Sequence, residues 1–239
     1  MKGIDKGTAN LYYFAGRNFT LTTLPQIACV MNNKYGTYMN LRILNITALF
    51  AALTIIGAMI KIPLPLPPPI PPLSMQTLFV ILSGIILGPK NGAMSQFLYL
   101  FIGIIGFPVF AEGGGPAYVL KPTFGYLLGF PLAAFIAGTI TYGKNAPAGL
   151  LEMRTHLGTL KPIRIAGAAA AGILAVFVLG IPYFFIIVHY FLELDRAFSA
   201  LLVGGFLVFI PGDIIKITII LALVKIIALE PRTSVHENP

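Results

Sequence analysis

Charged residues are scarce in this chain. Only 10% of its 239 residues are Asp, Glu, Lys or Arg, and 57% are hydrophobic, whereas a soluble domain carries about 25% charged residues. So few charges cannot cover the surface that a folded chain of this length presents to water. The mean hydropathy of +0.87 agrees. The composition excludes an ordinary water-soluble domain and predicts an integral membrane protein whose natural solvent is lipid.

Residues for covalent, metal or nucleotide chemistry are also missing. The single cysteine, Cys29, excludes an internal disulfide, and no Cys/His cluster has the spacing of a metal site. No glycine-rich loop ends in Gly-Lys-Ser or Gly-Lys-Thr, so we expect no ATP hydrolysis by P-loop chemistry. Nucleophile elbows, zinc-protease motifs and paired carboxylates within apolar segments are absent as well. We therefore expect no cofactor, no metal and no enzymatic activity.

Acidic residues are half as frequent as basic ones, which leaves a formal charge of +8. In a soluble domain, clustered Lys and Arg would suggest nucleic-acid binding. Here the charges lie in short segments between apolar runs, a placement that suits lipid headgroups and orientation in a bilayer. We therefore expect the lipid bilayer, and not nucleic acid, as a partner.

Long apolar runs are the main feature that is present. A helix that spans a bilayer needs roughly 20 apolar residues at about 1.5 Å each. Six segments meet or approach this length: about 41–60, 75–87, 93–107, 123–142, 163–188 and 200–229. A Gly-Pro-Lys-Asn-Gly break at 88–92 separates the two shortest, which predicts a helical hairpin. The predicted fold class is an all-α membrane protein, a compact bundle of six transmembrane helices.

The loop charges predict the orientation, because Lys and Arg are retained on the cytoplasmic side. With the N-terminus inside, twelve of the 16 basic residues fall in cytoplasmic segments. Lys61, Lys121 and Arg196 fall in outer loops, and Lys216 falls within a span. We expect both termini in the cytoplasm and a multi-pass protein of the plasma membrane.

The two ends of the chain differ from the apolar part. Residues 1–38 are polar and aromatic and lack the features of a secretory signal. Because Met39 begins a stretch that resembles a natural start, we expect residues 1–38 to be a peripheral extension or a mis-called start. Residues 39–230 then form the six-helix transmembrane substrate-binding domain, and residues 231–239 form a short cytoplasmic tail.

The predicted outer loops are rich in Pro and Gly. Prolines dominate residues 62–73 and favour an extended, polyproline-like path. This segment is either an apolar lid over a cavity or a stiff linker, and both interpretations stay open. Residues 110–118 contain a glycine triplet whose backbone can approach a ligand closely.

Two ionisable residues, Asp213 and Lys216, lie within the last apolar segment. A charge at mid-bilayer costs on the order of 3 kcal/mol on insertion scales, so two of them need a reason. At positions i and i+3 they share one helical face and can meet each other or a common ligand. Pro211 removes a backbone donor just upstream and predicts a kink, as in membrane helices that line cavities. The alternative is an ion pair that only locks helices together, or a lysine that reaches towards the interface.

Gln76 and Tyr126 are further candidates for ligand contacts. Gln76 can donate and accept hydrogen bonds at once, which suits a neutral amide-like ligand, although a residue that satisfies a helix end is an equal alternative. Tyr126 is either a ligand contact or a core aromatic residue.

Small residues recur on two segments. Ala48 and Ala52 are four apart on the first segment, and residues 166–172 of the fifth are all Ala or Gly. Such spacing lets helices approach closely in lipid. They serve either a partner subunit or the internal bundle, and internal packing is the commoner outcome, especially for the fifth segment.

Five motifs together resemble the BioY family, the biotin-binding S component of energy-coupling factor (ECF) transporters. The matching stretches are Pro-Leu-Ser-Met-Gln-Thr at 72–77, Leu-Gly-Pro-Lys-Asn-Gly at 87–92, Gly-Phe-Pro-Val at 106–109, Pro-Thr-Phe-Gly-Tyr-Leu-Leu-Gly-Phe at 122–130 and Ile-Pro-Gly-Asp-Ile-Ile-Lys at 210–216. They follow the family's order across residues 41–229. The resemblance implies high-affinity capture of biotin from outside and delivery through a transmembrane coupling subunit and two ATPase subunits.

The resemblance also implies roles for single residues. Asp213, Lys216 and Gln76 fall on polar positions of the biotin site, and Ala48 and Ala52 fall on the contact with the coupling subunit. Biotin's ureido N–H groups suit an Asp and its acceptors suit a Lys. Its fused rings need an apolar wall, for which Phe107, Phe110 and Tyr126 are the candidates.

This chain departs from the family near the glycine triplet. Lys121 replaces a glycine that many members have, and a polar ligand contact falls around Gly113 or Gly114, which cannot supply it with a side chain. Lys121 is a candidate partner for the biotin carboxylate. Two rivals stay open: an S component for another vitamin, and a solitary ion-coupled carrier in which Asp213 is a proton site.

Overall fold

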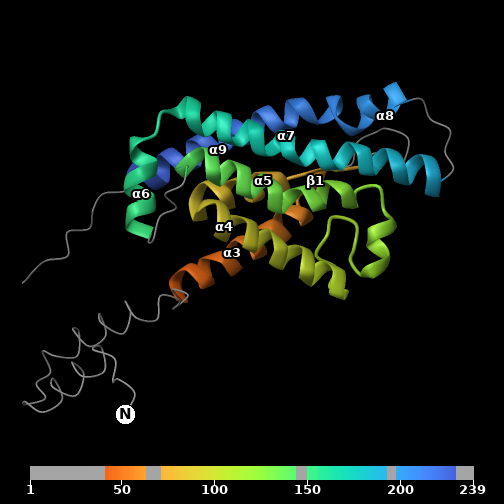
Figure 1. The fold of residues 1–239 in the computed structure, drawn as a ribbon, viewed down its shortest axis with the longest axis horizontal. Helices are drawn as coiled ribbons and strands as arrows, with labels where there is room; N and C mark the ends of the chain where they lie inside the picture. The colour runs from red at the N-terminus through yellow and green to blue at the C-terminus, as the bar shows by residue number, and fades with distance from the viewer. Residues whose placement is uncertain (1–40, 63–70, 144–149, 193–197, 230–239) are drawn as a thin grey trace, which may run out of the picture. The chain divides into compact units, whose positions relative to one another are not determined.

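Helices dominate the part of the chain that the computed structural model describes, which comprises residues 41–62, 71–143, 150–192 and 198–229 (Figure 1). The predictions for residues 1–38 and 231–239, most of the proline-rich loop and several loop charges, such as Arg196, lie outside these residues. The described elements are α3 (Leu41–Met59), β1 (Lys61–Ile62), β2 (Leu73–Ser74), α4 (Gln76–Ile105), η1 (Pro116–Leu120), α5 (Phe124–Tyr142), α6 (Leu150–Thr159), α7 (Pro162–Ile186), the π-helix η2 (Ile187–Phe191), α8 (Phe198–Gly205), η3 (Leu207–Phe209) and α9 (Ile210–Leu229).

The element α4 consists of two helical arms, residues 76–87 and 89–105, that fold back on each other. Gly88 separates them with φ 80° and ψ 176°, a backbone conformation that favours glycine. Near the ends of the arms, the side chains of Gln76 and Tyr99 are hydrogen-bonded although they are 23 positions apart, which in a straight helix would be about 35 Å. The helical hairpin predicted from the break at 88–92 is confirmed.

Neighbouring helices approach closely where glycine replaces a side chain. A Cβ atom on Gly84 would lie 2.1 Å from the carbonyl oxygen of Ala134 in α5, and one on Gly129 would lie 2.8 Å from Cα of Val176 in α7. Figure 1 shows the resulting order, with α3 beside α4, α4 beside α5 and α5 beside α7. In lipid, such close packing supplies the association that water would otherwise drive.

A fully buried polar network joins α3 to both arms of α4. The Thr54 hydroxyl donates to Oε1 of Gln96 at 3.3 Å, and Nε2 of Gln96 donates to the hydroxyls of Ser83 and Ser95 at 3.2 and 2.9 Å. The hydroxyls of Ser83 and Ser95 donate in turn to backbone carbonyls of their own helix, and the single Thr54 proton is shared between Gln96 and the closer carbonyl of Phe50 at 2.9 Å. Because lipid offers no alternative partners, this network holds the three helical segments in one register.

The last predicted span is interrupted. α8 ends at Gly205, Phe206 departs from helical geometry with φ −134° and ψ −64°, and α9 starts at Ile210. Pro211 therefore lies in the first turn of α9, where its missing N–H costs no hydrogen bond. The expected kink inside one continuous helix is thus a break between two helices, a few residues earlier.

Three of the six predicted apolar segments, 123–142, 163–188 and 200–229, correspond to described helices long enough to cross a bilayer. Within the described ranges, four candidate spans occur, Gln76–Ile105, Phe124–Tyr142, Pro162–Phe191 and Leu202–Ala228, together with a shorter apolar helix, Ile43–Met59. The first span contains the two arms of the hairpin. The all-α fold class is confirmed, with two-residue strands as the exception in this part of the chain, and the count of six crossings and their orientation remain predictions.

Helix α6 is absent from the prediction, which treated residues 143–162 as a loop. Its Arg154 donates through Nε to the carbonyl of Ile227 near the end of α9 at 2.9 Å. Nε2 of His156 lies 3.1 Å from the carbonyl of Thr141, and the His156 ring stacks on Tyr142 at the end of α5. Basic groups suit these carbonyls because a helix C-terminus carries partial negative charge.

Replacing Gly84 with alanine should destabilise the protein. The new Cβ would overlap the Ala134 carbonyl, and such overpacking costs about 1–3 kcal/mol. Gly167→Ala is the matched control, because Gly167 is an exposed helical glycine and a Cβ atom added there would have no neighbour within 4 Å. Thermal unfolding in detergent, followed by circular dichroism, should show a lower midpoint for Gly84→Ala only. Equal midpoints for the two variants would refute the close approach of α4 and α5.

Candidate functional site

Asp213 and Lys216 meet in the first turns of α9. Nζ of Lys216 donates to Oδ1 of Asp213 at 2.9 Å, and the two side chains are 3% (Lys216) and 9% (Asp213) exposed. The break before α9 places the carboxylate near a helix N-terminus, where negative charge is favoured. A single hydrogen bond joins the pair, so oxygen lone pairs of Asp213 and two N–H groups of Lys216 remain for a ligand.

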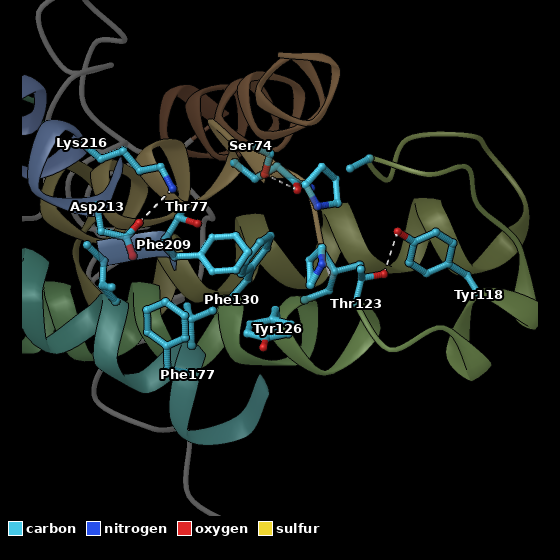
Figure 2. A pocket seen from close by; sticks show the side chains of 17 residues that line it. Ser74, Thr77, Tyr118, Thr123, Tyr126, Phe130, Phe177, Phe209, Asp213 and Lys216 are labelled. Atoms are coloured by element: carbon cyan, nitrogen blue, oxygen red, sulfur yellow. Dashed lines mark hydrogen bonds and ion pairs between the residues drawn. The ribbon is translucent and has the colours of Figure 1, made fainter. Parts of the chain in front are cut away.

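This ion pair forms one end of a pocket (Figure 2). The pocket contains about 630 Å³ of empty space, a figure that includes open solvent at its mouth. It is lined by residues of β2, α4, α5, α7 and α9 and of the adjoining loops: Pro71, Pro72, Ser74, Gln76, Thr77, Ala111, Tyr118, Thr123, Tyr126, Leu127, Phe130, Ile173, Val176, Phe177, Phe209, Asp213 and Lys216.

Aromatic rings from three helical elements form the middle of the pocket. The ring of Tyr126 lies 6.1 Å from that of Phe177 and 6.5 Å from that of Phe209. The Tyr126 hydroxyl donates to the carbonyl of Gly205 at 3.0 Å. Tyr126 therefore presents its ring to the pocket while its polar end ties α5 to the break before α9.

Gln76 lines the pocket from the start of α4, and both ends of its amide are engaged. The Ser74 hydroxyl donates to Oε1 at 2.9 Å, and Nε2 donates to the hydroxyl of Tyr99. That hydroxyl lies 3.3 Å from the carbonyl of Val109, which accepts its proton. Through Tyr99, Gln76 thus links strand β2 to Val109 in residues 106–115, the glycine-rich loop that follows α4. These hydrogen bonds keep its side chain oriented towards the pocket.

Four predicted ligand residues lie outside the pocket wall. Phe107 is 60% exposed, and Phe110 is 1% exposed because it packs between the rings of Tyr99 and Tyr118 at 5.4 and 4.7 Å. At Gly114 two segments of the loop backbone approach so closely that a Cβ atom would lie 2.0 Å from the carbonyl oxygen of Phe107. This position therefore requires glycine. In the described structure, Phe130, Phe177 and Phe209 are the phenylalanines that line the pocket, and the ligand contacts of Phe107 and Phe110 stay predictions.

The fourth of these residues, Lys121, makes its contacts within the loop between α4 and α5. It donates to the backbone carbonyl of Glu112 at 2.8 Å, lies 3.7 Å from the Glu112 carboxylate and faces the Tyr118 ring at 5.0 Å.

Burial raises the pKa of Tyr118, and Thr123 donates to its hydroxyl oxygen at 3.2 Å. Tyr118 therefore stays neutral at physiological pH and anchors this end of the pocket.

Several lining residues were missed although their spacing signals them. Phe209 precedes Asp213 by four positions, which places it on the same helical face. Helical spacing also links the lining residues that start at Thr123, just before α5, and continue along that helix at 126, 127 and 130. The same spacing links residues 173, 176 and 177 of α7. Starting from Asp213 and Tyr126, this periodicity would have found Phe209 and Phe130.

The small-residue segments differ in exposure. Ala48 and Ala52 lie on an exposed face of α3, whereas Ala51 and Thr54 on its other side are buried against α4. On α7, Ala168, Ala169 and Gly172 are buried, as the internal-packing interpretation predicts. In the described ranges, no group of three or more His, Cys, Asp or Glu side chains gathers as a metal site would require.

Curated relatives cover much of the chain. A protein of Lysinibacillus sphaericus named "Probable biotin transporter BioY" is 39% identical over 166 residues, which are 70% of this chain and 76% of that protein. The "Biotin transporter BioY" of Thermotoga maritima is 36% identical over 172 residues, 72% of this chain and 86% of that protein. Both names denote transporters, in agreement with the expectation that the chain is not an enzyme.

A solved structure shares the fold. It is described as the S component for biotin from an ECF-type ABC transporter, and it matches 82% of this chain and 96% of its own with a TM-score of 0.66 and 24% identity. The chain is accordingly a multi-pass helical membrane protein. The family model for BioY matches residues 31–232. The chain therefore belongs to the BioY family.

Proposed function

We propose that this chain is the membrane-embedded substrate-binding component of a biotin uptake system. The observation that carries the proposal is the buried Asp213–Lys216 pair at the end of an aromatic-walled pocket. The names of the relatives and the description of the structural neighbour supply the identity of the vitamin.

The chemistry of biotin fits this pocket. One N–H of its ureido ring can donate to the Asp213 carboxylate, and the adjacent ureido carbonyl can accept from the Lys216 ammonium. The fused rings then lie against Tyr126, Phe177 and Phe209, which supply the apolar contact that small-molecule sites use. Thr77 and Gln76 provide further polar groups at the pocket wall.

The chain has no P-loop motif for ATP hydrolysis of its own, so in this proposal a partner supplies the energy for uptake. We infer that an ECF transmembrane coupling subunit, with its ATP-binding cassette ATPases, binds the exposed face of α3 around Ala48 and Ala52. Small exposed residues four apart allow a partner helix to approach closely in lipid. The substrate-binding component itself needs no cofactor in this scheme.

Asp213→Asn and Lys216→Met should each weaken biotin binding about 10- to 100-fold, because each removes a charge-assisted hydrogen bond to the ureido group. Isothermal titration calorimetry on the detergent-solubilised protein measures this, with riboflavin and thiamine as ligands for the rival vitamins. Lys225→Met is the control, since Lys225 is an exposed lysine of the same helix. Unchanged affinity in both variants would reject the site.

A double variant, Ala48→Leu with Ala52→Leu, should keep biotin binding and lose uptake, because two larger side chains would separate α3 from the coupling subunit. Uptake of labelled biotin by cells that co-express the coupling and ATPase subunits measures the loss. Ala170→Leu, on an exposed position of α7, serves as the matched control. Full uptake by the double variant would remove α3 from the proposed interface, and uptake without any ATPase would favour the ion-coupled carrier.

A further inference from the structure

The two ends of the pocket differ in what they offer a ligand. Figure 2 shows the pocket running from Asp213 and Lys216, past the aromatic rings, to Thr123 and Tyr118. At the first end, Nζ of Lys216 lies 2.9 Å from Oδ1 of Asp213, and the two opposite charges leave no net charge there. In the described part of the chain, the wall has no other charged side chain. A carboxylate on the ligand must therefore find its cation at the rim of the pocket.

Lys61 lies at this rim. It pairs with Ser74 in the antiparallel β1–β2 ladder, and residues directly opposite each other in such a pair place their side chains on the same face. Ser74 lines the pocket, so the Lys61 side chain starts on the pocket face of the ladder. Its Nζ donates to the backbone carbonyl of Ala111, which also lines the pocket. The ammonium group thus bridges two segments of the wall.

Within the part of the chain that the structure describes, no acidic side chain pairs with Lys61. Among the described residues its partner is a neutral carbonyl and no carboxylate, which leaves the full charge and two N–H donors for a ligand. Lys121, the other outer lysine, already faces the Glu112 carboxylate and the Tyr118 ring. Apart from Lys216, no described cation lines the pocket; Lys90, for example, lies at the hairpin turn of α4 and Lys225 near the end of α9.

We propose that Lys61 is the cation that binds the carboxylate at the end of the ligand's acid chain. This assignment rests on the proposed function. It adds a second polar contact between the protein and biotin, beside the contact at Asp213 and Lys216. The ureido ring occupies the neutral end at Asp213 and Lys216, and the acid chain extends towards the end bordered by Ser74 and Thr123. Lys61 then selects a ligand with an anionic tail over an otherwise identical neutral one.

Comparing biotin with biotinamide, in which a primary amide replaces the carboxylate, tests this assignment by calorimetry on the full chain in detergent. The unmodified protein should bind biotin at least about tenfold more tightly than the amide, because a charge-assisted hydrogen bond is stronger than a neutral one. Lys61→Met should weaken biotin binding by about the same factor and leave the affinity for biotinamide within about threefold. The preference for biotin should then disappear.

Lys121→Met is the matched control, an outer lysine that is already paired, and it should retain the preference for biotin. Loss of the preference in Lys121→Met and not in Lys61→Met would overturn the assignment. Equal weakening of both ligands by Lys61→Met would also overturn it, because it would show that Lys61 only ties β1 to the glycine-rich loop. If the unmodified protein bound neither compound, the proposed function itself would fail, whereas an unchanged preference in Lys61→Met would reject Lys61 alone.

Discussion

A carboxylate and an ammonium group are held 2.9 Å apart within an apolar bundle, and the arrangement around them follows from the cost of burying them. An unpaired charge there would be several kcal/mol less favourable than in water, on the order estimated for buried ions. The break between α8 and α9 starts a helix beside the pair, and Tyr126 ties that break to α5 through the carbonyl of Gly205. The rings of Phe177 and Phe209 line the same pocket as the pair. The pair is thus tolerated because the pocket is built around it.

Two features hold the helices of the pocket wall together. Glycines let their backbones pack closely, and buried polar side chains form hydrogen bonds between them. Gly84 and Gly129 let α4, α5 and α7 touch through their backbones. The network around Gln96 fixes α3 against both arms of α4. A polar group in lipid that loses its partner cannot turn to water, so such networks tolerate few alternative packings. The wall is therefore held in place by its own helix contacts, and Lys61 of β1 meets the carbonyl of Ala111 at its rim.

Much of this fold could be predicted from the sequence because lipid makes hydrophobic length decisive. The boundaries of α3 and α5 and the hairpin at Gly88 follow from apolar runs and from turn residues. Helix α6 could not be found in this way, because it is short and polar and is stabilised by helix-end carbonyls of α5 and α9 that are distant in sequence. The contact between Asp213 and Lys216 followed from their spacing. The burial of Phe110 away from the pocket depends on how the glycine-rich loop folds, which no periodicity encodes.

The ion pair also bears on how the site responds to the electric field across the membrane. A single buried charge that moved through the full field would exchange about 2.3 kcal/mol per 100 mV with it. Asp213 and Lys216 lie three positions apart on one helix and carry opposite charges, so the work done on one cancels that done on the other when the helix moves as a unit. The site can thus change its depth in the bilayer without drawing on, or opposing, the membrane potential.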